Sequence, residues 1–100
     1  MDKLPKDYRV DVLERPRALS ALILLLRAGR SLNAGEFHEA LGAASAHTSM
    51  ALRAYLKAHG LIEEKPGADR LFITITLTEK GRAVAEEALR IRERVHGKGK

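Results

Sequence analysis

The chain contains no cysteine, no tryptophan and no glutamine, and only 4% of its 100 residues are aromatic. Without cysteine, disulfide scaffolds, thiol catalysis and cysteine-based metal sites are excluded. With so few aromatic residues, the core must consist mainly of leucine, isoleucine, valine and alanine. The lack of glutamine beside abundant arginine is compatible with a thermophilic source.

Long hydrophobic runs are also missing. The longest is "ALILLL" at residues 21–26, far short of the roughly 20 residues that a membrane-spanning helix needs. No segment combines the basic start, apolar centre and small-residue cleavage site of a secretory leader. We therefore expect a soluble, cytoplasmic protein with no membrane partner.

The length and composition predict a single globular domain over residues 1–100, because 45% of the residues are hydrophobic and 31% are charged. We expect its core to span residues 12–95, with an N-terminal arm at residues 1–11 and a flexible basic tail at residues 96–100. No separate ligand-binding domain fits into this length. Any small-molecule effector would have to bind between subunits or act through another protein.

Positive charge is in excess, with a net charge of +5 and an isoelectric point near 9.9. This balance favours a polyanionic partner. The charge is unevenly placed, since no acidic residue occurs between Glu39 and Glu63, whereas Arg53 and Lys57 fall inside that interval.

The first half of the chain predicts three helices. "RALSALILLLRAG" begins after Pro16, which suits the first turn of a helix, and ends at Gly29. A short extended piece, Ser31–Leu32, leads into "NAGEFHEALG", in which Asn33 and Glu36 have the spacing of a capping box. After a tight turn, "SAHTSMALRAYLKAHG" predicts the third helix, capped by Ser45.

The second half predicts a hairpin and a long helix. "LIEEK" and "LFITITL" read as strands joined by the turn "PGADR". The second strand alternates, so that Leu71, Ile73, Ile75 and Leu77 point one way and the intervening residues the other. Thr78 is expected to cap the last helix, roughly residues 79–95.

The order of these elements and three stretches of the sequence are similar to those of a known family of proteins. The stretches are "VLERPRALSALILLL", "LNAGEFHEALGAASAHTSMALRAYLKAHGLIEE" and "ITLTEKGRAVAEEAL", with "LxxxGLI" at Leu56–Ile62 and "LTEKGR" at Leu77–Arg82 as the clearest signatures. Over residues 12–89 the chain resembles winged helix-turn-helix proteins of the MarR/ArsR/PadR kind. The resemblance implies an α+β, mostly helical fold with a two-stranded β-hairpin wing and a C-terminal helix.

The same resemblance implies that the last helix packs on the first and often carries the contact between subunits. The sequence departs from such families at two places in the third helix. Ser49 stands where an aliphatic residue is common, and Arg53 stands where Leu or Ile is common.

The third helix, about residues 45–59, is the predicted recognition helix for a DNA major groove. Its helical period groups Ser49, Leu52, Tyr55, Leu56 and His59 on one side, and this side is expected to pack inward. The opposite side is expected to face DNA. It comprises Ala46, His47, Met50, Arg53, Ala54 and Lys57.

Each outward residue has an expected role. Arg53 is predicted to read guanine through a bidentate contact, and Lys57 to bind backbone phosphate. His47 could contact a base or a phosphate, Met50 and Ala46 a thymine methyl group, and Ser45 and Thr48 a phosphate at the helix start. In the wing, Lys65 and Arg70 could reach DNA, although Glu63, Glu64 and Asp69 nearby would oppose it. The alternative is a solvated basic face with no ligand.

The last helix predicts a dimer. Apolar residues recur along it at spacings of three and four, as in a heptad stripe, and the first helix is more apolar than one covered face requires. The alternative is packing of the same two helices within one chain. The expected interface residues are Leu24, Leu25, Val84, Ala88, Ile91 and Val95.

No catalytic or cofactor site is predicted. The four histidines, at positions 38, 47, 59 and 96, lack metal-ligand spacing, and surface histidines are their ordinary explanation, with a metal sensor as the alternative. Adjacent glutamates such as Glu63–Glu64 do not face each other, so they form no acid–base pair. We expect no enzyme, no cofactor and no bound metal.

The sequence therefore predicts a sequence-specific double-stranded DNA-binding transcriptional regulator that acts as a homodimer. Two alternatives stay open. One is a winged-helix module that docks onto protein, and the other is a non-specific architectural DNA-binding protein.

Overall fold

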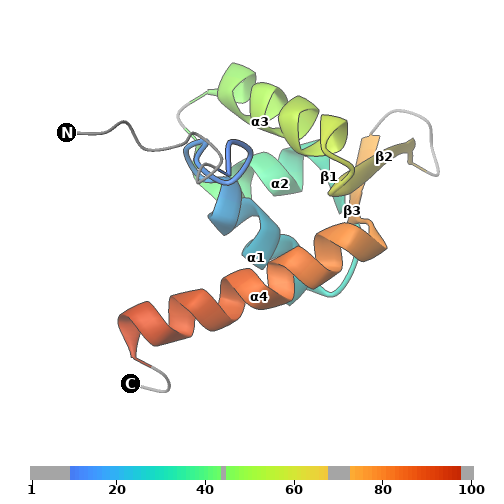
Figure 1. The fold of residues 1–100 in the computed structure, drawn as a ribbon. Coiled ribbons are helices and arrows are strands. Elements are labelled where there is room, and N and C mark those ends of the chain that lie inside the picture. The colour runs from blue at the N-terminus through green and yellow to red at the C-terminus, as the bar shows by residue number, and fades with distance from the viewer. Residues whose placement is uncertain (1–9, 44, 68–72, 98–100) are drawn as a thin grey trace, which may run out of the picture.

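The computed structural model describes residues 10–43, 45–67 and 73–97. It confirms the predicted fold class and order of elements (Figure 1). The sheet has a third strand, because the short extended piece before the second helix pairs with the hairpin. The elements are α1 (Ala18–Ala28), β1 (Leu32–Asn33), α2 (Ala34–Leu41), α3 (Ala46–Ala58), β2 (Ile62–Pro66), β3 (Ile73–Leu77) and α4 (Glu79–His96).

Helix α1 begins two residues later than the sequence predicts. Pro16 is not in its first turn, because Arg17 takes a left-handed backbone conformation (φ 68°) immediately before Ala18. This conformation is costly for a residue with a side chain. It allows Arg17 Nη1 to donate a hydrogen bond to the carbonyl oxygen of Leu41, 3.1 Å away at the end of α2, where a cation is favoured by the helix dipole.

The capping box of α2 is confirmed. Asn33 Oδ1 accepts the backbone N–H of Glu36 at 2.8 Å, and Glu36 Oε1 accepts that of Asn33 at 3.0 Å. Arg30 also donates to the Glu36 carboxylate. The hydrogen bond from Arg30 and, to a smaller extent, that from the backbone of Asn33 hold the pKa of Glu36 below its usual value.

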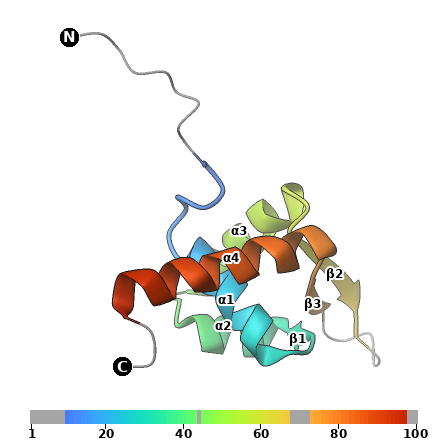
Figure 2. The ribbon, with the colours of Figure 1, turned by 60° about the horizontal axis from the view of Figure 1, so that its bottom comes forward.

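The core is centred on α1, which lies between α4 on one side and α2 on the other (Figures 1 and 2). This confirms that the apolar first helix is covered on two sides. Ala85 and Ala88 let α4 come close to α1. The largest fully buried side chains are Phe37, Leu22, Leu56 and Ile75.

The wing is the antiparallel pair β2–β3, which lies beside the start of α4 and far from its C-terminal end (Figure 2). The predicted alternation of β3 is confirmed at Ile75, which is fully buried, whereas Ile73 near the strand start is exposed. The expected positions of Leu71 and Phe72 lie outside the described residues. None of the helices in the described part of the chain combines the length and apolar character needed to cross a membrane.

The turn from β3 into α4 is held by Thr78. Its hydroxyl oxygen accepts the backbone N–H of Gly81 at 2.9 Å and donates to the carbonyl oxygen of Gly60 at 2.6 Å. Gly81 is buried against the backbone of Leu61, and a Cβ atom at this position would lie 1.8 Å from the Leu61 carbonyl oxygen. Glycine is therefore required where α4 crosses the residue that precedes β2.

We predict that Gly81→Ala lowers the free energy of unfolding by about 2–3 kcal/mol, since backbone must move to admit the methyl group. Alanine is otherwise the better helix former by about 1 kcal/mol. Gly35→Ala is the matched control, because a Cβ at Gly35 in α2 meets only Asn33 Oδ1 at 3.4 Å. Urea unfolding followed by circular dichroism should show a loss at Gly81 and none at Gly35.

Candidate nucleic-acid interface

Helix α3 lies at one edge of the molecule, with the wing at its C-terminal end (Figure 1). Ser45 caps it as predicted, its hydroxyl oxygen accepting the backbone N–H of Thr48 at 3.2 Å. The first turn contains no acidic residue. The helix dipole and the local charge are therefore both favourable to an anion near this end.

Burial shows which side of α3 faces the protein. Ser49, Leu52, Arg53 and Leu56 are buried, in the i, i+3, i+4, i+7 pattern of one helix face. This confirms the inward assignment of the serine and the two leucines. His59 was also assigned inward, and the structure places it on the surface. The exposed residues of α3 are Ala46, His47, Thr48, Met50, Ala54, Lys57 and Ala58.

The predicted outward orientation of Arg53 is wrong. Its Nε lies 3.4 Å from Glu64 Oε2 of strand β2, and the two side chains are only 11% and 15% exposed. Arg53 Nε and Nη1 are buried and donate no hydrogen bond to any acceptor among the described residues. A side chain held in this way cannot reach a base edge, so the role of guanine reader loses its basis.

Glu64 also faces a second cation of α3. Lys57 Nζ lies 3.8 Å from Glu64 Oε1, and the lysine side chain is 57% exposed. An ion pair as exposed as this is weak, so Lys57 remains able to exchange its partner for another anion. One carboxylate of the wing therefore lies between two cations that are one helical turn apart on α3.

The other polar residue on the inward side, Ser49, also has a partner. Its hydroxyl lies 2.6 Å from Nδ1 of His38, a half-buried residue of α2. The sequence predicted a surface histidine at position 38, and the structure instead places the ring in the contact between α2 and α3. Both departures from the family pattern in α3 are thus matched by a polar group on a neighbouring element.

A residue that the sequence analysis missed lies on the flank of α3 away from the wing. Arg15 is exposed, and its guanidinium carbon lies 4.4 Å from the centre of the Tyr55 ring. Beside it is an open hollow of about 290 Å³. No local sequence pattern places Arg15 against α3. The hollow is lined by Arg15, Pro16, His47, Thr48, Ala51 and Leu52.

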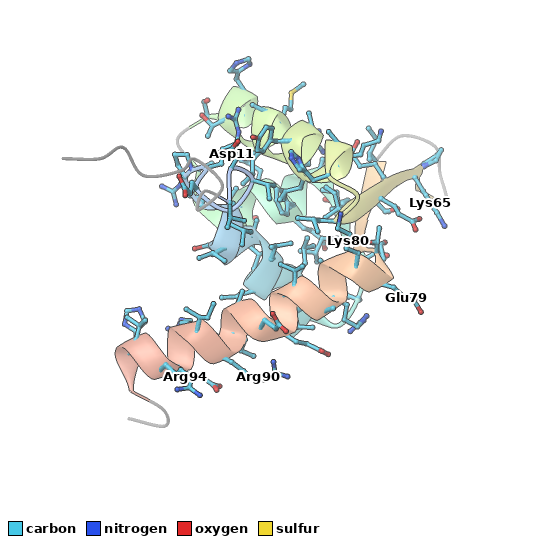
Figure 3. All side chains as sticks on the ribbon, in the orientation of Figure 1. Asp11, Lys65, Glu79, Lys80, Arg90 and Arg94 are labelled. Carbon is cyan, nitrogen blue, oxygen red and sulfur yellow. The ribbon has the colours of Figure 1, made fainter. Side chains whose placement is uncertain are left out.

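The wing contributes little free positive charge in its described part. Lys65, near the end of β2, points outward (Figure 3), but its Nζ lies 3.5 Å from Oε1 of Glu63. The other predicted wing contact, Arg70, lies outside the described residues. Within the same described part, no three histidine, aspartate or glutamate residues are grouped as metal ligands would be.

The six residues predicted for a dimer interface are not all on one surface. Leu25 and Ala88 are buried within the chain itself, so their assignment to a subunit interface is wrong. Leu24 and Val84 are partly buried against the same core. Ile91 and Val95 are 52% and 73% exposed. They border a hollow of about 260 Å³ between α4 and α1, also lined by Leu19, Ser20, Ile23, Ala88, Arg92 and His96.

We predict that Glu64→Gln destabilises the protein by about 3 kcal/mol, because it leaves the buried Arg53 cation without its counter-charge. Glu63→Gln makes the same charge change one residue away on an exposed side chain, and should cost less than about 0.5 kcal/mol. Arg53→Met should cost less than Glu64→Gln, since Glu64 keeps Lys57. Denaturant unfolding of the three variants tests this order, and equal small effects at positions 63 and 64 would contradict it.

No protein-family model and no curated protein match the chain. Solved structures do match. A MarR family protein from Bacillus stearothermophilus is 26% identical over 85% of this chain, with a TM-score of 0.69. MepR, a transcription regulator of the Staphylococcus aureus multidrug efflux pump MepA, is 23% identical over 77%, with a TM-score of 0.68. A mutant MarR from E. coli complexed with operator DNA is 17% identical over 86%, with a TM-score of 0.69.

The chain is shorter than these three proteins. Its matched part spans 61%, 56% and 62% of their lengths, respectively. The likeness extends over 77–86% of this chain. The chain is a winged helix-turn-helix protein with the fold of the MarR-type transcriptional regulators.

Proposed function

We propose that this protein is a double-stranded DNA-binding transcriptional regulator that inserts α3 into the major groove, and we assign it no catalytic activity. The observation that carries this proposal is the exposed side of α3, which has no carboxylate and consists mostly of small side chains. The likeness of the chain's fold to that of a mutant MarR complexed with operator DNA supports the same proposal.

The small side chains have a physical consequence for DNA binding. Ala46, Ala54 and Ala58 leave the helix backbone unobstructed, so that α3 can lie deep in a groove about 12 Å wide. Met50 is the one large apolar side chain exposed on α3, and its position suits a thymine methyl group. Lys57 can bind a phosphate once it leaves Glu64.

With Arg53 turned inward, His47 is the residue best placed on the exposed side of α3 to hydrogen-bond a base edge. A single good contact of this kind discriminates between bases by about 1–3 kcal/mol. Further sequence preference would have to come from the shape and deformability of the duplex. This small set of base-reading groups is also what favours the second candidate, an architectural protein with little sequence preference.

We also propose that the protein acts as a homodimer through the exposed end of α4. Ile91 and Val95 lie in the C-terminal part of α4, which extends past α1 (Figures 1 and 2). Together with Ile23 of α1 they border an open apolar hollow, which a second copy related by two-fold symmetry would cover. Two α3 helices would then reach half-sites about 34–36 Å apart.

The DNA-binding proposal predicts different effects at two positions of α3. Lys57→Ala should weaken binding to all sequences alike and reduce the salt slope of the affinity by about one. His47→Ala should instead flatten the preference among sequences. Fluorescence anisotropy over a salt series, with selection of bound sequences from random DNA, separates the two effects. Strong sequence selection that His47→Ala leaves unchanged would contradict the base-reading role of His47. Weak selection by the wild type would favour the architectural alternative. If the wild type binds no DNA, the protein-docking alternative is favoured.

The dimer proposal predicts that Ile91→Asp combined with Val95→Asp yields a monomer, because two charges would be buried in the subunit contact. Arg90→Asp is the control, since Arg90 points away from α1 on the other side of α4 (Figure 3). Sedimentation velocity at micromolar concentration should give a dimer for the wild type and the control. A monomeric wild type would refute the dimer.

A further inference from the structure

The N-terminal turn, residues 10–17, brings Arg15 and Pro16 to the flank of α3 that faces away from the wing. Arg15 stacks on Tyr55, whereas Glu64 of the wing pairs with Lys57. Tyr55 and Lys57 are two residues apart, which is about 200° around a helix. The N-terminal turn and the wing therefore lie on opposite sides of the exposed face of α3.

The turn has a defined backbone, so Arg15 projects from a fixed position. The N–H groups of Leu13 and Glu14 donate to the carbonyl oxygen of Val10 at 2.9 and 3.1 Å, and the N–H of Ala18 donates to that of Arg15 at 3.0 Å. Val12 and Leu13 pack against the core. At its end, the hydrogen bond from Arg17 to Leu41 ties the turn to α2.

Arg15 is also a cation with no counter-charge among the described residues. No carboxylate of that part of the chain lies within ion-pair distance of its guanidinium, and its interaction there is with the face of the Tyr55 ring. Glu14, its neighbour, directs a carboxylate oxygen to the N–H of Val10 at 3.4 Å. Stacking on an aromatic face leaves the N–H groups at the edge of the guanidinium available for a phosphate.

We propose that Arg15 binds a backbone phosphate of the duplex, with Tyr55 holding its guanidinium in place. The proposal rests on the DNA binding proposed above and adds a ligand residue to it. An α-helix with its side chains is about 10–12 Å across and fills a major groove of about 12 Å, so residues on both flanks of α3 approach the phosphates that border the groove.

The charges on the two flanks favour this assignment. On the wing side, the cations Arg53, Lys57 and Lys65 all lie within 4 Å of Glu63 or Glu64. A phosphate must compete with these carboxylates. On the side of the N-terminal turn, the guanidinium of Arg15 borders the same hollow as His47 and Thr48 at the start of α3, and a phosphate there breaks no ion pair between described residues.

The test compares Arg15→Gln with Arg90→Gln. Both remove one positive charge from an exposed arginine, but Arg90 lies on α4 and points away from α1 and α3 (Figure 3). Binding of a mixed-sequence duplex is measured over a salt series by fluorescence anisotropy. Arg15→Gln should lower the affinity several-fold on all sequences and reduce the salt slope by about one, whereas Arg90→Gln should leave the slope unchanged.

Tyr55→Leu provides a second readout. It keeps the Arg15 charge but removes the aromatic face, and should reproduce part of the loss seen for Arg15→Gln, provided that its thermal unfolding shows a folded protein. Equal slopes for the Arg15 and Arg90 variants would overturn the proposal while leaving DNA binding intact. Failure of the proposed function is recognised separately, because the wild type would then bind no duplex.

Discussion

Two polar contacts fix the rotation of α3 about its own axis. Ser49 meets His38 of α2 at 2.6 Å, and Arg53 meets Glu64 of β2 at 3.4 Å. A buried polar group is tolerated only where it finds a partner, and a rotation of α3 by one residue would remove both partners at once. The side of α3 that faces solvent is therefore set by contacts made on its opposite side.

These contacts also determine which chemistry the exposed side can offer. Turning Arg53 inward removes the strongest base-reading group from that side. What remains is a set of small side chains and three larger ones, His47, Met50 and Lys57. Positive charge moves to the flanks, where Lys57 shares Glu64 and Arg15 rests on Tyr55. Such a surface is better suited to close approach and phosphate binding than to reading many bases.

The packing of α4 divides the molecule in a similar way. Its N-terminal part, up to Ala88, is committed to the chain's own core through Gly81, Ala85 and Ala88, whose small size permits close contact with Leu61 and α1. Its second half leaves Ile91 and Val95 exposed. One apolar stripe in the sequence thus lies partly in the core and partly on the surface, and the change from small to large residues along it marks the division.

Local signals in the sequence determined the elements of this protein. The caps at Asn33, Ser45 and Thr78 act over three residues of chain, and the periods of the helices and of β3 follow from backbone geometry alone. Only the tertiary structure decided the orientation of Arg53, which lies one helical turn from both Ser49 and Lys57, so that it could belong to either face. Glu64, eleven residues further along the chain, settles it, just as Tyr55 gives Arg15 its place. Partners brought together by folding leave no periodic trace in sequence, and for that reason the fold could be predicted more fully than the site.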